Sequence, residues 1–343
     1  MKIPHHYIGK EQAFIKHRLL ETYLERLFMI IGQHQSQIRY VDCFAGPWNT
    51  ESDDLQDTSI AISLRLMKAC RESLKKMGKN VQFKALFIEK DPVSYQKLDS
   101  FLKSQWHDGI SAESLQGDFY PLRSEILRWC GDDDFTFFFI DPTGWKKVVE
   151  IQTLCPLLMR KKSEYLINFM FDFVLRAHSQ PLFEEHMKKI FGKTPDTSGF
   201  SSKKREAHLI ELYRSQLINV HEQSGYERPR SAFVRILDPI KDRTKYHLVY
   251  LTRHPLGIVV FMEESEKLDL VQKYVRAQTK QDHRVFRTGQ GELFPAETGI
   301  SGDRMDFEAV KDYWLEQLTF DPKQFGIDQL ADMLEETGWF ITD

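Results

Sequence analysis

Four carboxylates follow short apolar runs of the sequence, at points where the strands of a parallel sheet would end. They are Asp42, Glu89, Asp118 and Asp141. Ligands of open parallel sheets bind at the carboxyl ends of the strands, so these side chains are candidates for a common site. A carboxylate at such a position can accept hydrogen bonds or attract a cation. The sequence therefore predicts a polar ligand site along one edge of a sheet.

The turn after the first apolar run has no phosphate-binding pattern. Neither the G-x-G-x-x-G spacing of nicotinamide dehydrogenases nor a G-x-x-x-x-G-K-[ST] loop is present, which disfavours NAD(P)H and ATP. The segment D-x-F-A-G instead resembles the first motif of class I S-adenosylmethionine (SAM) methyltransferases, in the form seen in enzymes that methylate nucleic-acid bases. Small residues let the backbone approach a ligand without phosphate. The predicted cofactor contacts in this turn are Asp42, Phe44, Ala45, Gly46 and Pro47, of which Asp42, Ala45 and Gly46 are expected to hold the methionine part of SAM.

The second and third runs supply the other predicted cofactor contacts. Glu89, followed by Lys90, ends the second run, where a carboxylate can accept both ribose hydroxyls. Asp118 can accept the adenine amino group while Phe119 packs on the ring. Three acids in this order fit an adenosyl site, although each alone also fits a helix N-cap or a surface acid.

The fourth run ends in Asp141-Pro142, with Trp145 three residues further on. Enzymes that methylate amines place an acid, a proline and an aromatic residue here. The lone pair of an exocyclic base amine is delocalised into the ring, so acceptors such as Asp141 must draw on its N–H groups. Trp145 can stack on the base. The alternative is an ordinary Asp-Pro turn that caps a helix.

Two polar residues near the fifth run are predicted to contact the substrate. Asn168 stands at a strand end and is expected to face the same cleft as Asp141. Arg176 either lines this cleft and contacts phosphate, or forms a surface ion pair with Asp172 four residues before it on a helix.

These residues are positioned by alternating strands and helices. The apolar runs are at 38–44, 83–88, 114–116, 135–140 and 165–170, with helices predicted at 12–31, 60–76, after Asp91-Pro92 and after Pro121. Runs without polar alternation suit strands covered on both faces. The predicted fold class is α/β, with a Rossmann-like, mostly parallel sheet of class I methyltransferase type.

The second half of the chain departs from this alternation. Helices at 182–191 and 203–220 form a predicted helical insertion, residues 177–230, whose basic start at 203–205 fits either a solvated helix or a phosphate contact. Runs at 232–237 and 246–251 are predicted strands. The turn at 252–257 predicts a hairpin into a further β run, so the methyltransferase-like domain is expected to cover 1–265. A small α-rich module is predicted at 266–343, with helices at 306–318 and 327–336 and a strand at 339–341, an order that fits a winged-helix-like module.

Taken in order, these segments resemble the three-Cys-motif partner protein (TcmP) family over roughly residues 10–265. The matching segments are YVDCFAGP (40–47), FIEKDP (87–92), GDF (117–119), FFIDP (138–142) with Gly144-Trp145, NFM (168–170) with Asp172 and Arg176, and LTRHPLG (251–257). The resemblance implies a methyltransferase fold and a partner of radical-SAM type that bears a three-cysteine motif. It also implies links to mobile elements or defence.

Composition and charge limit the classes of protein and the partners that remain to be considered. The 343 residues include no apolar run long enough for a membrane span and no signal-like start, which predicts a cytoplasmic protein without membrane contact. The four cysteines are too far apart for a zinc or redox motif and are expected to be buried thiols. Residues 306–343 carry a net charge of −8 and the rest +5, so nucleic acid would meet the body of the protein rather than its acidic end.

The leading hypothesis is a SAM-binding methyltransferase that acts on a nucleic-acid base amine without a metal. A competing hypothesis is a non-catalytic binding partner with a degenerate methyltransferase fold. Trp48, which stands where the family has a second glycine, and the one-residue extension between Asp141 and Trp145 favour this hypothesis. A third hypothesis, methylation of a protein or a small molecule, agrees with the modest charge of the body.

Overall fold

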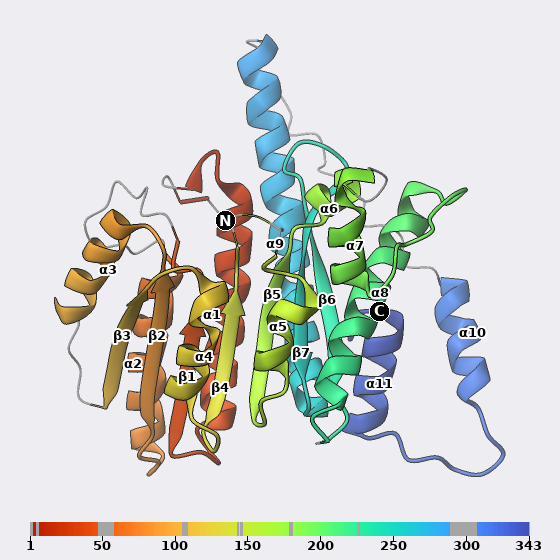
Figure 1. Ribbon diagram of the computed structural model, residues 1–343. Coiled ribbons are helices and arrows are strands. Elements are labelled where there is room, and N and C mark those ends of the chain that lie inside the picture. The colour runs from red at the N-terminus through yellow and green to blue at the C-terminus, as the bar shows by residue number, and fades with distance from the viewer. Residues whose placement is uncertain are drawn as a thin grey trace.

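The computed structural model describes residues 3–4, 7–46, 58–104, 109–142, 144, 147–177, 181–225, 227–288 and 307–342. Its centre is a seven-stranded sheet with helices on both faces (Figure 1). The strands are β1 (Gln37–Asp42), β2 (Gln82–Glu89), β3 (Ile110–Gln116), β4 (Phe135–Ile140), β5 (Ser163–Phe169), β6 (Arg230–Leu237) and β7 (Thr244–Thr252). The helices are α1 (Glu11–Ile31), α2 (Ser59–Lys76), α3 (Pro92–Ser104), α4 (Phe119–Cys130), α5 (Ile151–Leu158), α6 (Phe171–Ala177), α7 (Glu184–Phe191), α8 (Ser202–Glu222), α9 (Pro255–Thr288), α10 (Phe307–Gln317) and α11 (Ile327–Thr337).

The strand order is β3-β2-β1-β4-β5-β7-β6. Strands β1 to β5 are parallel, whereas β7 is antiparallel to both β5 and β6. The chain winds outward in both directions from the β1–β4 pair, which is therefore the switch point of the sheet. The predicted α/β class, with its Rossmann-like sheet, helical insertion and α-rich C-terminal part, is confirmed.

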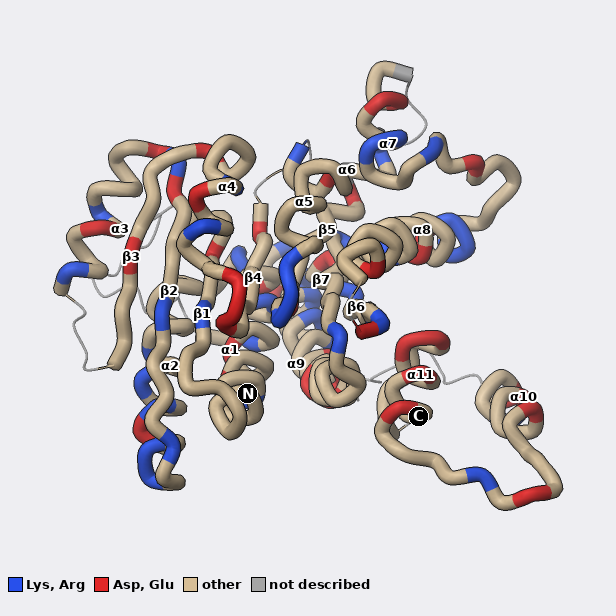
Figure 2. The backbone as a smooth tube through the Cα atoms, turned by 60° about the horizontal axis from the view of Figure 1, so that its bottom comes forward, with Lys and Arg blue, Asp and Glu red and all other residues tan. Residues whose placement is uncertain are grey.

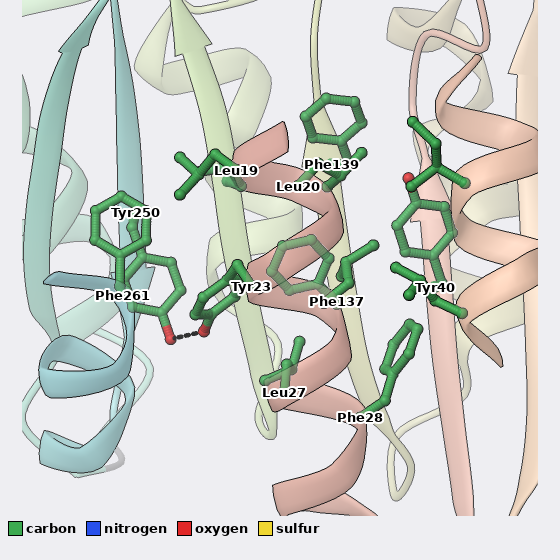
Figure 3. Packing of buried hydrophobic residues seen from close by; sticks show 14 of the residues in the cluster. Leu19, Leu20, Tyr23, Leu27, Phe28, Tyr40, Phe137, Phe139, Tyr250 and Phe261 are labelled. Atoms are coloured by element: carbon green, nitrogen blue, oxygen red, sulfur yellow. Dashed lines mark hydrogen bonds between the residues drawn. The ribbon is translucent and has the colours of Figure 1, made fainter. Parts of the chain in front are cut away.

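Both faces of the sheet are buried, which explains the continuous apolar runs. Neighbouring residues of a strand point to opposite faces, so Tyr40 and Phe137 enter the core under α1, while Val41 and Phe138 enter the core under α5 and α8. Figure 3 shows the first core, where Tyr23 of α1 meets Tyr250 of β7. Strands that serve two cores therefore carry mostly apolar side chains.

Local sequence signals begin several helices. Thr58 accepts a hydrogen bond from the amide of Ala61 at the start of α2, and Asp118 accepts one from Tyr120 at the start of α4. Asp91 accepts one from Ser94 in the first turn of α3. These side chains satisfy amides that have no partner within the helix. The helix start predicted at Asp91-Pro92 is confirmed, whereas α4 begins at Phe119, three residues before the start predicted after Pro121.

The predicted hairpin after β7 is wrong. Residues 258–262 belong to the 34-residue helix α9, which begins at Pro255 and whose first half is buried against α1 and the sheet. Proline suits the first position of a helix, and the apolar run gives this half of α9 its buried surface. The predicted domain boundary at 265 falls inside α9 and stays a prediction.

The C-terminal helices differ in their contacts. Helix α11 packs on α9 and β6, where Arg230 forms an ion pair with Asp332 at 2.6 Å and the amide of Ser231 donates to Glu335 at 2.7 Å. Helix α10 has no buried residue. The predicted strand at 339–341 is wrong, because residues 338–342 form no strand, which removes the strand that a winged-helix-like module would need.

Candidate ligand site at the carboxyl edge of the sheet

The strand order brings the predicted site residues into one row. Along the edge from β3 to β5, the strand ends carry Asp118, Glu89, Asp42, Asp141 and Asn168. These positions are far apart in the sequence, but parallel strands end at the same edge. The row crosses the switch point between β1 and β4, where open α/β sheets bind ligands.

The turn after β1 is held by the strands on either side. The amide of Cys43 donates to the carbonyl of Phe139 in β4 at 2.9 Å, and that of Ala45 donates to Ile88 in β2 at 2.8 Å. Gly46 has a φ of +51°, which L-residues with a Cβ rarely adopt. The turn thus presents backbone at the switch point, as predicted. Pro47 and Trp48 lie outside the described residues.

Asp42 is fully buried beside this turn. It accepts hydrogen bonds from the amide of Phe44 at 3.1 Å and from the hydroxyl of Ser59 at 2.6 Å. Burial raises its pKa to about 7, and the charge of Asp141 acts in the same direction. The hydrogen bonds from Ser59 and Phe44 and the charge of Lys16 oppose this rise. Asp42 can therefore exchange a proton near neutral pH and would gain from a cationic ligand.

The residues predicted for the ribose and the adenine have different environments. Glu89 is buried and accepts a hydrogen bond from the amide of Asp91 at 2.7 Å, whereas Lys90 is exposed. Asp118 is exposed and caps α4, which matches the alternative interpretation. Phe119 is buried against Phe44, with ring centroids 5.2 Å apart. The structure thus puts a carboxylate at each predicted strand end, with the capping role established for Asp118.

Asp141 and Asn168 form the polar centre of the row. The Nδ2 of Asn168 donates a hydrogen bond to Oδ1 of Asp141 at 2.7 Å. This direct contact agrees with the prediction that the two side chains face the same cleft. The Oδ1 of Asn168 is buried and has no hydrogen-bond partner among the described residues. A buried amide oxygen without a partner costs free energy, which a ligand N–H would recover.

Lys16 of α1 is a site residue that sequence reasoning missed. Its ammonium forms an ion pair with Oδ2 of Asp141, and both side chains are largely buried. Lys16 lies among the buried residues Ile15, Leu19 and Leu20 of an amphipathic helix, so it looked like a boundary residue. No local signal connects positions 125 residues apart, and only the packing of α1 on the sheet does so.

The other predicted residues lie apart from this centre or outside the described residues. Pro142 is buried, and Trp145 is outside the described residues. Arg176 is 59% exposed and pairs with Asp172 at 3.4 Å, as the ion-pair interpretation expected. Asp172 also binds Arg243 of the β6–β7 turn at 2.9 Å, a contact the sequence did not reveal.

The described part of the chain offers no metal site, since no three His, Cys, Asp or Glu side chains come together there. Cys43, Cys70 and Cys130 are buried as expected, but Cys155 is partly exposed. None of the described helices is long and apolar enough to cross a membrane.

A cavity of about 460 Å³ lies at the opposite edge of the sheet, by the first residues of β4 and β5. Its wall includes Glu164, a buried carboxylate that accepts hydrogen bonds from the hydroxyls of Tyr250 at 2.7 Å and Thr252 at 2.9 Å. These bonds join β5 to β7 and satisfy the carboxylate. The cavity is separate from the row of strand-end residues.

The fold is that of a Rossmann-like α/β protein, and the row of strand-end carboxylates makes the switch point of its sheet the candidate ligand site. No family model and no curated protein matches the chain. Protein LPL1258 of Legionella pneumophila, described with the family DUF519, has a TM-score of 0.40 and 9% identity over 77% of this chain and 92% of its own.

Two further solved structures are similar at a lower level. MNMC2 of Aquifex aeolicus has a TM-score of 0.32 and 13% identity, covering 65% of this chain and 55% of its own. A putative Zn-dependent alcohol dehydrogenase of Rhodobacter sphaeroides has a TM-score of 0.28 and 9% identity, covering 66% and 88%.

Proposed function

We propose that this chain is a SAM-dependent methyltransferase that acts on an exocyclic amine of a nucleic-acid base. The observation that carries the proposal is the Asp141–Asn168 pair. It combines a carboxylate with a buried amide oxygen that lacks a partner among the described residues. An amine presents two N–H groups, and these two acceptors can receive both. Drawing on the N–H groups localises the nitrogen lone pair, which the delocalised base amine needs before it can attack.

The cofactor contacts in this proposal follow the row toward β3. Asp42, with the turn of Phe44, Ala45, Gly46 and Pro47, holds the methionine part; Glu89 and Lys90 hold the ribose; Asp118 and Phe119 hold the adenine. The residues fit such a ligand because a buried, largely desolvated Asp42 gains from a nearby cation, and because Gly46 keeps the turn open. When bound, SAM supplies an electrophilic methyl carbon that takes the amine lone pair, while the sulfur keeps the electron pair of the broken bond. Trp145 stacks on the base, and the amine proton passes to Asp141 or to solvent.

The ion pair between Lys16 and Asp141 favours a second candidate function. An ammonium on Oδ2 of Asp141 occupies one of its two oxygens, as a substrate amine would. In this alternative the chain is a catalytically degenerate member of the TcmP family that docks a radical-SAM-like three-Cys-motif protein of a mobile-element or defence system. In the enzyme, by contrast, the substrate amine displaces Lys16.

Calorimetric titration and methyl transfer together test the proposal. The wild type, Glu89→Ala and Asp141→Ala are titrated with SAM and with its demethylated product, and are then assayed with labelled SAM on DNA and RNA. We expect Glu89→Ala to lose SAM binding. Asp141→Ala should bind SAM like the wild type while transfer falls by at least 100-fold. Glu113→Ala, an exposed acid on β3, is the matched control.

The outcomes separate the two candidates. Transfer by Asp141→Ala at the wild-type rate would refute the role of the Asp141–Asn168 pair. If the wild type binds no SAM and transfers no methyl group, but co-purifies in a stable complex with a three-Cys-motif protein, the docking function replaces the catalytic one.

A further inference from the structure

Helix α9 continues well beyond the layer of helices that covers the sheet. Its last buried residue is Val275, and residues 280–288 are all exposed. At 1.5 Å per residue, the part after Val275 extends for about 20 Å. Figure 1 shows this part rising past the carboxyl ends of β4 and β5, the same edge that carries Asp141 and Asn168. We call residues 276–288 the arm.

The arm carries a stripe of cations on one face. Lys280, Arg284 and Arg287 are four and three residues apart, which places them on the same side of a helix over about 10 Å. Within the arm, residues 276–288, the chain has four Lys and Arg residues against one acid, Asp282, and Arg276 is paired with Asp242, whereas the whole chain has a net charge of −3. Such local excess of positive charge favours a polyanionic partner.

An exposed aromatic side chain accompanies the cations. Phe286, next to Arg287, is 90% exposed, and Tyr274 lower on the helix is 43% exposed. Cations that follow a phosphate backbone and aromatic rings on which bases stack are the combination that binds single-stranded nucleic acid. An acidic protein surface would not need the aromatic rings.

The base of the arm is linked to the candidate site through a series of hydrogen bonds and an ion pair. Arg276 donates to the carbonyl of Asp238 at 3.0 Å and to the carboxylate of Asp242 at 3.2 Å, both in the β6–β7 turn. Arg243 of the same turn binds Asp172, which lies four residues after Asn168. The arm is therefore held at a fixed place relative to the strand ends.

The acidic C-terminal helices lie away from the carboxyl edge of the sheet. Figure 2 shows α10 and α11, with their acids, at the lower right beyond α9, and α11 is paired with Arg230 at the first residue of β6, at the opposite edge of the sheet. The acidic charge thus lies away from the arm, which reduces repulsion of a phosphate chain there.

We propose that the arm binds the phosphate backbone of a nucleic-acid strand and leads an unpaired base of that strand to Asp141 and Asn168. The delivery of the base rests on the proposed methyltransferase function, while the binding of the strand by the arm does not. A base must leave its stack to be modified, so a single strand is the favoured form.

Fluorescence anisotropy with a labelled 20-nucleotide single strand, at 50–200 mM salt, tests the arm in the full chain. The arm variant is Lys280→Gln/Arg284→Gln/Arg287→Gln. The matched control is Lys68→Gln/Lys75→Gln/Lys76→Gln, which removes three exposed cations of α2. We expect the arm variant to bind at least tenfold more weakly, with a salt slope smaller by about 2, because each phosphate contact contributes about 0.7. The control should retain the wild-type slope.

The proposal is overturned if the arm variant binds like the wild type, or if the control loses as much affinity. It is also overturned if polyglutamate competes as well as an unlabelled strand does, since the arm would then bind any polyanion. Calorimetry with SAM distinguishes failure of the proposed function: a wild type that binds the strand through the arm but binds no SAM keeps this proposal and loses that one.

Discussion

Replacing Asp42 by asparagine should change how the stability of this protein depends on pH. In the native state the pKa of Asp42 is raised to about 7 by burial, whereas an unfolded aspartate titrates near 4. Between these values the native state binds a proton that the unfolded state does not. The free energy of unfolding therefore falls as pH rises from about 4 to 7 and then becomes constant with respect to this group.

The size of the effect follows from the two pKa values. The difference between the native and unfolded pKa corresponds to a change of about 4 kcal/mol in the free energy of unfolding over the whole range. About 3 kcal/mol of this change occurs between pH 5 and 8. Asparagine does not titrate, and its oxygen can still accept from the amide of Phe44, while the hydroxyl of Ser59 can rotate. The free energy of unfolding of Asp42→Asn, measured relative to that of the wild type, should thus rise by about 3 kcal/mol from pH 5 to pH 8.

Urea denaturation at pH 5, 6, 7 and 8, with linear extrapolation to water, measures this difference. Ser59→Ala serves as a comparison. It removes a hydrogen bond that lowers the pKa of Asp42, so the loss of stability with rising pH should continue to a higher pH than in the wild type. A difference between Asp42→Asn and the wild type that stays constant from pH 5 to 8 would refute the argument, because Asp42 would then have the same charge in the native and unfolded states.

Two further predictions concern packing and the proposed cofactor. A Cβ at Gly257 would lie 2.6 Å from the hydroxyl of Tyr250 and 2.8 Å from that of Thr252, so Gly257→Ala should destabilise the protein by about 1–3 kcal/mol in urea titrations. Gly144→Ala, whose Cβ would meet no atom of the described residues within 4 Å, should have a smaller effect, and equal effects of the two would contradict this packing argument. If Asp42 faces the cationic part of SAM, its pKa falls on binding and close to one proton is released at pH 6. Calorimetry in two buffers of different ionisation enthalpy detects that proton, and its absence at pH 6 would exclude the proposed role of Asp42.

The strands were predictable where both faces of the sheet are covered. β1, β2, β4 and β5 are continuous apolar runs because alternate side chains fill two cores, and each run ends where the chain leaves them. β3 was only a weak run, because as an edge strand it has no fully buried residue. The start of α9 was misassigned because a run of apolar residues after a Pro-Gly turn has the same local pattern in a buried helix as in a strand.

The candidate site was predictable only in its strand-end half. Strand ends can be read from the sequence, so Asp42, Glu89 and Asp141 were found where their runs stop. Lys16 and Arg243 enter from a helix and a turn that are distant in the sequence, and nothing near them shows which carboxylate they approach. Only tertiary packing supplies this information, which is why the ion pairs of Lys16 with Asp141 and of Arg243 with Asp172 were not predicted.

Lys16 connects the chemistry of the site with the choice between its two candidate functions. Its ammonium pairs with Asp141 and opposes the rise in the pKa of Asp42, so it influences both the proposed substrate half and the proposed cofactor half of the row. A substrate amine that displaces Lys16 frees Oδ2 of Asp141 as an acceptor. In a non-catalytic protein, the same ion pair would be a permanent contact that stabilises the packing of α1 against the end of β4. Lys16→Met should therefore leave methyl transfer measurable in the enzyme, whereas in the docking protein its only effect would be lower stability.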